Sequence, residues 1–154
     1  MMRTKGYTLL ELLIVVFIIG LVSSSIVIKM YDHPTSKEID AFAELLQLRL
    51  KVVRQQAMSQ SAVLGLIVKK NNYTFYQYII KTRRWYPLEK VDHFWQTYSI
   101  PEGIQVSWQD RFIVILPSGD MTPFQMIIQG KKNLHPIQLS ADEYGTIVIK
   151  EKQT

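Results

Sequence analysis

The most unusual chemical feature of the sequence is one acidic residue, Glu11, inside its most apolar stretch. The residues from Leu12 to Val22 are apolar apart from Gly20. A carboxylate in a membrane-length apolar segment costs about 2.5 to 3.5 kcal/mol on insertion scales, judged from the comparable Asp. Buried charges persist when they are paired. We therefore expect Glu11 to meet a positive group supplied by a neighbouring chain.

Cleavage of the chain after Gly6 would create such a group. It would expose the α-amino group of Tyr7, four residues before Glu11. A neighbouring helix that is staggered along the same axis could then present this amine to the carboxylate. Under this hypothesis Glu11 sets the register in which the helices assemble.

The segment that carries Glu11 has the length of a membrane span. Residues 9–30 in a helix would cover about 33 Å at about 1.5 Å per residue, and the hydrocarbon core of a bilayer is about 30 Å thick. Within this range only Glu11 and Lys29 are charged, and Lys29 lies at the far end, where its side chain can reach the interface. We predict a transmembrane helix over residues 7–30.

Charges before the segment orient it. Arg3 and Lys5 favour a cytoplasmic N-terminus, which sends the remainder of the chain across the membrane. An ordinary secretory signal is an alternative, since small residues at 23–25 could flank a cleavage site. A signal that is discarded has no reason to carry Glu11, so a retained helix explains the sequence better.

The run Lys5-Gly6-Tyr7-Thr8-Leu9-Leu10-Glu11, followed by the apolar stretch, resembles the class III signal of type IV pilins and type II secretion pseudopilins. The resemblance implies a leader over residues 1–6 and cleavage after Gly6 by a prepilin peptidase. It also implies N-methylation of the new first residue, Tyr7, and a role for Glu11 in docking subunits within the membrane. Tyr7 departs from the phenylalanine that is usual at this position.

A second, amphipathic helix is predicted within residues 31–61. Pro34 interrupts the pattern after the membrane segment, and Thr35 and Glu38 have the spacing of a capping box. Apolar residues then recur at steps of three and four: Ile39, Phe42, Leu46, Leu50, Val53 and Ala57. We expect this stripe to pack on a sheet, with these charged residues toward the other side: Glu44, Arg49, Lys51 and Arg54.

The pattern of residues 62–154 predicts a β-rich domain. Runs that favour strands occur at 63–68, 73–80, 104–108, 112–116, 124–128 and 146–149. Asn71-Asn72 is a hairpin signal between the first two runs, and the short spacing between runs favours antiparallel pairing. The predicted fold class is α+β and pilin-like: a long N-terminal helix, membrane-spanning in its first half, packed on an antiparallel sheet.

Two C-terminal stretches make the resemblance to pilins and pseudopilins more specific. The loop and strand at 116–124, Leu-Pro-Ser-Gly-Asp-Met-Thr-Pro-Phe, and the stretch at 139–149 look like those of the minor pseudopilin H family of type II secretion (GspH-type). Between residues 73 and 100 the likeness is loose.

The H-family resemblance implies a function and a location. It implies a structural subunit near the tip of a periplasmic pseudopilus, which links the tip complex to the shaft for export of folded proteins. The chain would cross the inner membrane of a Gram-negative bacterium once, with its C-terminal domain in the periplasm. Its partners would be major and minor pseudopilins and the prepilin peptidase. The alternative is a FimT-like minor pilin of a type IV pilus, involved in pilus assembly or DNA uptake.

One basic cluster bears on that alternative. Lys81, Arg83 and Arg84 stand beside Trp85 and Tyr86, and cations beside aromatic rings can hold phosphate and stack bases. Further cations are Lys69, Lys70, Lys131 and Lys132. Such clusters usually mark a solvated hairpin end, and a net charge of +5 is mild, so binding of nucleic acid is not expected.

No pattern in the sequence indicates an enzyme or a cofactor. The sequence has no cysteine, and His33, His93 and His135 stand far apart. Asp142 and Glu143 could contribute to a calcium loop, but an acidic pair in a turn is normally solvated. We predict no catalytic, cofactor or metal site.

Aromatic residues are dense between positions 73 and 98. Aromatic side chains bury large areas and are frequent at protein interfaces, and alternation along strands places about half of them outside the core. We predict a partner surface formed by Trp85, Tyr86, Phe94 and Trp95.

Overall fold

The computed structural model describes residues 9–29, 34–90, 92, 95–108, 112–131 and 134–151, with their side chains except those of 20–29 and 134. The chain divides into two compact units, Met1–His33 and Pro34–Thr154. The predicted leader, with Gly6, and the predicted first residue after cleavage, Tyr7, lie outside the described residues.

The first unit contains helix α1, Leu9–Lys29. Glu11 lies in its first turn, and the side chains of residues 9–19 are all exposed within this chain. In the part of the chain whose side chains are described, no helix is long and apolar enough to cross a membrane. The predicted span over 7–30 extends beyond that part and stays a prediction.

The second unit begins with helix α2, Ser36–Ser59, and the predicted capping box is confirmed. The Glu38 backbone N–H donates to Thr35 Oγ1 at 3.3 Å, and the Thr35 backbone N–H donates to Glu38 Oε2 at 2.7 Å. Two backbone donors at the start of the helix are thus satisfied by side chains. These contacts fix where α2 begins.

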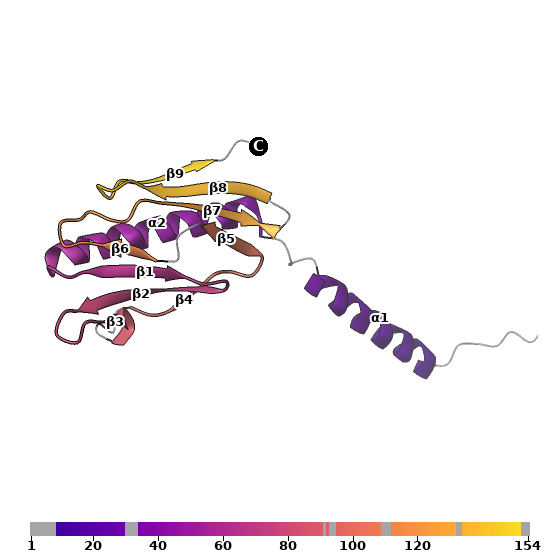
Figure 1. Ribbon diagram of the computed structural model, residues 1–154. Helices are drawn as coiled ribbons and strands as arrows, with labels where there is room; N and C mark the ends of the chain where they lie inside the picture. The colour runs from indigo at the N-terminus through magenta and orange to yellow at the C-terminus, as the bar shows by residue number, and fades with distance from the viewer. Residues whose placement is uncertain are drawn as a thin grey trace, which may run out of the picture. The chain divides into compact units, whose positions relative to one another are not determined.

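The apolar stripe predicted for α2 is also confirmed. Its buried residues are Ile39, Phe42, Ala43, Leu46, Leu50, Val53 and Ala57. The helix packs mainly against three strands of one sheet and also against one strand, Leu64–Val68 (β1), of another (Figure 1). Removing these side chains from water is the main force that holds α2 to the strands.

The strands form two antiparallel sheets (Figure 1). Sheet A has the order β3-β2-β1-β6, with β4 also paired to β2. Its strands are Leu64–Val68 (β1), Asn72–Ile79 (β2), Arg84–Pro87 (β3), Tyr98–Ser99 (β4) and Ile113–Ile115 (β6), and a short 3-10 helix, Leu88–Lys90, follows β3. Sheet B has the order β5-β7-β8-β9. Its strands are Ile104–Trp108 (β5), Phe124–Gly130 (β7), Leu134–Ala141 (β8) and Ile147–Glu151 (β9).

The runs predicted to be strands from the sequence do not include β8. Pro136 argues against a central strand because it cannot donate a ladder hydrogen bond. The structure accommodates it where the register of β7 and β8 shifts, between the pairs Ile128↔Ile137 and Gly130↔Leu134. The proline therefore lies at an irregularity of the ladder.

Candidate assembly surfaces

The first candidate surface is the exposed apolar start of α1 with its single acid. The apolar side chains between Leu9 and Ile19 are each between 48% and 87% exposed. Glu11 lies among them, in the first turn of the helix. An apolar helix surface of this size requires either lipid or other chains around it.

The second candidate surface is the face of sheet A that points away from the core. We call it the aromatic face: Tyr76, Tyr78, Trp85, Phe112 and Val114, all half-buried. The strand register places Tyr76 and Val114 on either side of Gly65, and Tyr78 opposite Trp85. The ring centroids of Trp85 and Phe112 are 4.6 Å apart in an edge-to-face arrangement, and those of Trp85 and Tyr78 are 5.4 Å apart.

Gly65 lies beneath one of these rings, that of Phe112. A Cβ atom added to Gly65 would lie 2.5 Å from Phe112 Cζ and 3.0 Å from the carbonyl oxygen of Ile113. Any side chain at position 65 would therefore push the Phe112 ring away from the sheet. The absence of a side chain at position 65 leaves room for the Phe112 ring beside the Gly65 backbone.

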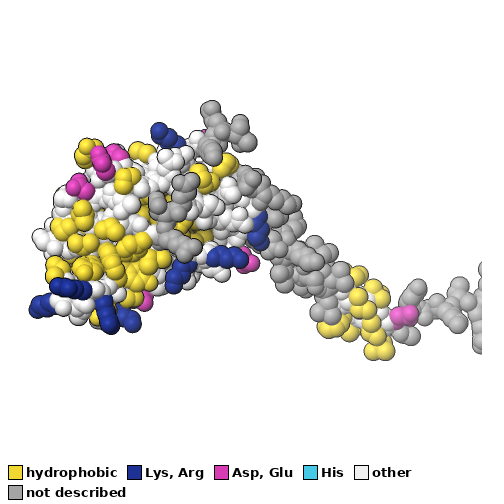
Figure 2. Space-filling model, viewed as in Figure 1, with side chains coloured by type: hydrophobic (Ala, Val, Ile, Leu, Met, Phe, Trp, Pro, Cys, Tyr) yellow, Lys and Arg dark blue, Asp and Glu magenta, His cyan; other side chains and the backbone are white. Residues whose placement is uncertain are grey.

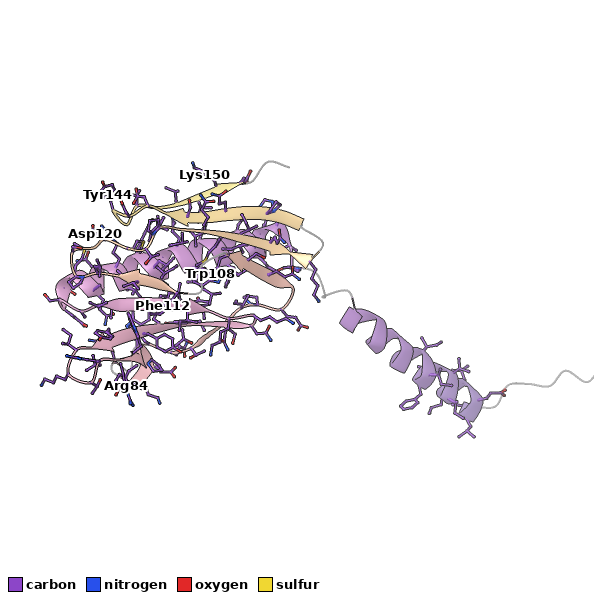
Figure 3. The ribbon with its side chains drawn as sticks, in the orientation of Figure 1. Arg84, Trp108, Phe112, Asp120, Tyr144 and Lys150 are labelled. Carbon is purple, nitrogen blue, oxygen red and sulfur yellow. The ribbon has the colours of Figure 1, made fainter. Side chains whose placement is uncertain are left out.

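The predicted basic cluster lies at one end of this surface. Lys81, Arg83 and Arg84 are exposed at the turn between β2 and β3, and Figure 3 shows Arg84 at this end of the sheet. Arg83 adopts a left-handed backbone conformation, with φ of 53°. Lys69 and Lys70 lie in the turn at the opposite end of β2, so these cations do not form one continuous patch.

The prediction that Trp95 lies on a partner surface is wrong. Its side chain is 4% exposed, it packs edge-to-face on Phe75 with centroids 5.1 Å apart, and its Nε1 donates to Gln56 Oε1 at 2.8 Å. A long aromatic side chain with a satisfied polar atom is typical of a core position. Tyr86 is half-buried on the strand β3, where alternation places it on the opposite face of sheet A from Trp85. Phe94 lies outside the described residues.

One arginine joins the helix to the loop and turn that carry the H-family likeness. Arg54 Nε donates to the carbonyl oxygen of Gly119 at 2.7 Å, and its Nη2 donates to that of Tyr144 at 3.0 Å. Gly119 belongs to the loop before β7, and Tyr144 belongs to the β8–β9 turn. The prediction that Arg54 points away from the sheet side is wrong, because its guanidinium group bridges these two segments.

A second arginine of α2 is also tied to the sheet side. Arg49 Nη1 donates to the hydroxyl group of Tyr73, and Arg49 Cζ lies 3.6 Å from the centroid of the Tyr98 ring. Burial raises the pKa of Tyr73 above its ordinary value of 10.0, and Arg49 opposes this effect. The prediction that Arg49 points away from the sheet is therefore wrong as well.

Both arginines could have been found from the sequence by their spacing. Arg49 follows Leu46 by three residues, and Arg54 follows Leu50 by four. Both therefore lie at the border of the apolar stripe, where a long side chain can lie along apolar surface and place its charge at the edge.

The turn between β8 and β9, which contains Asp142 and Glu143, is closed by a hydrogen bond within the turn. Asp142 Oδ1 accepts from the Thr146 backbone N–H at 2.7 Å, and this bond is the main reason why the pKa of Asp142 is lowered. No group of three or more potential metal-ligating side chains occurs among the described residues. The arrangement closes the β8–β9 turn.

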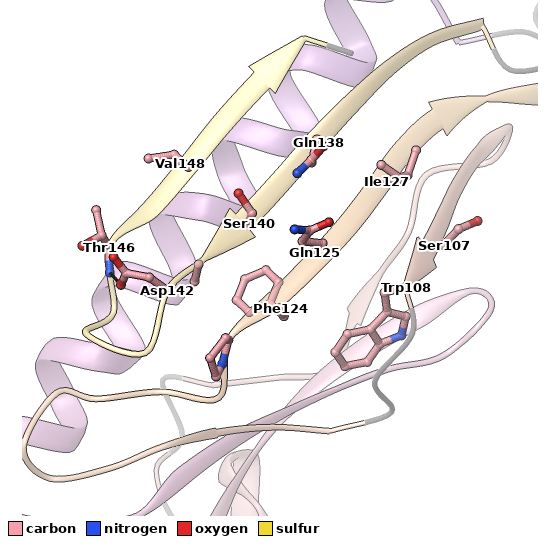
Figure 4. Close-up of a pocket in the computed structure, with 12 residues that line it drawn as sticks. Ser107, Trp108, Phe124, Gln125, Ile127, Gln138, Ser140, Asp142, Thr146 and Val148 are labelled. Carbon is pink, nitrogen blue, oxygen red and sulfur yellow. Dashed lines mark hydrogen bonds between the residues drawn. The ribbon is translucent and has the colours of Figure 1, made fainter.

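The outer face of sheet B mixes neutral polar and apolar side chains, and Lys150 lies on it opposite Gln138. Gln125, Gln138 and Ser140 stand on it beside Ile127 and Val148 (Figure 4). They line an open hollow of about 850 Å³. The two sheets therefore present different outer faces, one aromatic with charged ends and one that mixes neutral polar with apolar side chains.

Comparison with known proteins finds similar sequences and folds. Residues 1–27 match the prokaryotic N-terminal methylation motif. The type II secretion system protein H of Aeromonas hydrophila is 23% identical, with 98% of this chain and 96% of that protein covered. The H protein of Pseudomonas aeruginosa is 24% identical, with 82% of this chain and 83% of that protein covered.

The fold is that of pilin-like subunits. The minor pseudopilin EpsH of Vibrio cholerae superposes with a TM-score of 0.64 at 21% identity, over 74% of this chain and 97% of that one. The type IV minor pilin FimU of Pseudomonas aeruginosa superposes with a TM-score of 0.58 at 15% identity, over 74% and 89% of the two chains. Together, these matches confirm the predicted pilin-like α+β fold and the resemblance to the H family.

Proposed function

We propose that this chain is an H-type minor pseudopilin, a structural subunit of the pseudopilus of a type II secretion system. The observation that carries the proposal is the agreement along nearly the whole chain with type II secretion H proteins, joined to the methylation motif at the N-terminus. In this role the chain catalyses no reaction and works through its contacts with other subunits.

The finer assignments belong to the same proposal. The leader 1–6 is removed by a prepilin peptidase between Gly6 and Tyr7, and Tyr7 is then N-methylated. The helix over 7–30 crosses the inner membrane once and leaves residues 31–154 in the periplasm. The exposed apolar side chains of α1 and the position of Glu11 in its first turn support this arrangement. The subunit lies near the tip and links the tip complex to the shaft.

A deletion strain tests the function. We expect an in-frame deletion to abolish release of exoproteins and to leave DNA uptake, scored on the same cultures, unchanged. The likeness to the pilin FimU favours one second candidate, a minor pilin of a type IV pilus. Intact secretion with lost uptake would replace our proposal with that one.

A single substitution tests the role of Glu11. Glu11→Ala should be processed and inserted normally, because removal of the charge makes the segment easier to insert, but its incorporation into filaments should fall. Glu44→Ala is a matched control, since Glu44 is exposed on α2. Mass spectrometry of the N-terminus separates failed processing from failed docking, and normal incorporation of Glu11→Ala would contradict the proposed pairing.

A further inference from the structure

We infer that the aromatic face and its two oppositely charged borders dock a neighbouring pilin-like subunit whose own surface carries the charges in the reverse order. The inference rests on the proposed function, because it assigns a surface to contacts within the pseudopilus. It concerns only the second unit of the chain, residues 34–154.

The centre of the surface is apolar and runs across the strands from β6 to β3. The Trp85 ring lies between those of Phe112 and Tyr78, and Val114 extends the surface to the edge of the sheet. Beyond the edge, Leu116 is 42% exposed and Tyr144 is 69% exposed. Figure 2 shows hydrophobic side chains gathered over this region.

The two borders carry opposite charges. Lys81, Arg83 and Arg84 stand at the β3 side. At the β6 side, Asp120 and Glu143 are exposed and line, with Val114, Leu116 and Tyr144, a hollow of about 520 Å³. Figures 2 and 3 show this order, with acidic side chains near Tyr144, apolar side chains around Phe112, and basic side chains near Arg84.

An apolar centre with a charged rim is the arrangement of a protein interface. Single-stranded nucleic acid instead needs open ring faces for stacking and a track of cations along the backbone. Here Trp85 and Phe112 meet edge-to-face, and the acidic border would repel phosphate. The surface therefore suits a protein partner better than a nucleic acid.

The charge order also bears on which protein docks. A second copy that docked through this same face could match the two borders only by turning through a two-fold axis, and such an isologous contact closes a dimer and does not extend a filament. A different subunit of the same filament can match them head-to-tail. The borders would then fix the orientation of that subunit, because like charges would meet in the reversed arrangement.

The absence of cysteine from the chain makes a direct test practical. Single cysteines are placed in the full chain at Val114, in the aromatic face, and at Ser140, on the outer face of sheet B. Each is labelled with a benzophenone maleimide and illuminated in membranes of cells that assemble the pseudopilus. We expect Val114→Cys to cross-link to another pseudopilin and Ser140→Cys to give at least about tenfold less adduct.

Charge reversal tests the borders separately. Lys81→Glu with Arg84→Glu should reduce the Val114→Cys adduct about tenfold, since each exposed pair turns from weak attraction to repulsion. Lys131→Glu with Lys150→Glu makes the same change in charge at exposed positions outside the borders and should leave the adduct unchanged. Reversing acidic residues of the cross-linked partner to lysine should restore the yield.

Each other result overturns the inference. An adduct to a second copy of this chain would assign the face to self-association, and equal adducts from both cysteines would remove its special role. If the paired Glu variants weaken binding of a labelled oligonucleotide and leave the adduct intact, the basic border serves nucleic acid. Normal secretion in the deletion strain refutes the proposed function itself. Lost secretion in that strain, with unaffected adducts and secretion in the border variants, refutes only this surface.

Discussion

Gly145→Ala and Arg54→Ala together test the contact between α2 and the β8–β9 turn. Gly145 has a φ of 78°, where a side chain costs about 1 to 2 kcal/mol. An added Cβ would also overlap Arg54 Nε and would lie 2.6 Å from the carbonyl oxygen of Gly119. Overpacking of this kind costs about 1 to 3 kcal/mol. We expect Gly145→Ala to lower the free energy of unfolding by about 2 to 5 kcal/mol.

Arg54→Ala removes the two hydrogen bonds from the guanidinium group. Their partners are the carbonyl oxygens of Gly119 and Tyr144. The side chain is half-buried, so solvent reduces their value, and we expect a loss of about 1 to 2 kcal/mol. In the double variant the added Cβ no longer overlaps Arg54. The double variant should therefore lose about 1 kcal/mol less free energy of unfolding than the sum of the two single-variant losses.

The assay is urea unfolding of the full chain in mild detergent, followed by tryptophan fluorescence. The three tryptophans, Trp85, Trp95 and Trp108, all lie in the second unit, so the signal reports on that unit. A loss of 2 kcal/mol should lower the urea midpoint by about 1 M. Lys51→Ala, exposed on the same helix, is the control and should shift it little. Strict additivity of the two variants would refute the proposed overlap.

Two further predictions use the same assay. Thr35→Ala should cost about 1 kcal/mol, because it removes the side chain that caps α2, and Thr35→Ser should restore most of it; equal losses in the two variants would argue against the capping role. The raised pKa of Tyr73 means that its stabilising contribution is fully present below about pH 10 and is lost as the pH rises through the folded-state pKa. Titration toward about pH 11 should therefore destabilise the wild type more than Tyr73→Phe, and parallel curves would contradict the assignment.

Local signals in the sequence predicted the elements that depend on local chemistry. The capping pair Thr35 and Glu38 and the stripe from Ile39 to Ala57 are confirmed, because both follow from helix geometry alone. The hairpin at Asn71-Asn72 is confirmed, because β1 and β2 pair antiparallel on either side of it, although neither asparagine has a positive φ.

Features that depend on distant pairing were not predictable in the same way. The strands β3 and β4 are four and two residues long, too short for alternation to be recognised. The pairing of β1 with β6 joins Leu64 to Ile115, and nothing near either residue indicates the other. The division of the strands into two sheets follows from such pairings.

The residues of the candidate surfaces likewise differ in whether the sequence predicted their positions. Trp85 was placed correctly outside the core, whereas Trp95 was not, because its burial depends on Gln56 and Phe75 in other elements. The two residues of the acidic border also come from separate parts of the sequence. Asp120 and Glu143 become neighbours only because the loop before β7 and the β8–β9 turn meet, with the Met121 backbone N–H donating to the Glu143 carbonyl oxygen at 3.0 Å.

The edge of β6 has a consequence for the chain before it joins a filament. Thr122 pairs with Val114 in both directions: its N–H donates to the Val114 carbonyl at 2.9 Å, and its hydroxyl accepts from the Val114 N–H at 3.1 Å. Exposed strand edges readily recruit strands from other chains and lead to aggregation. With this edge occupied from within, a waiting subunit is protected there from uncontrolled strand addition and remains available for ordered assembly through its faces.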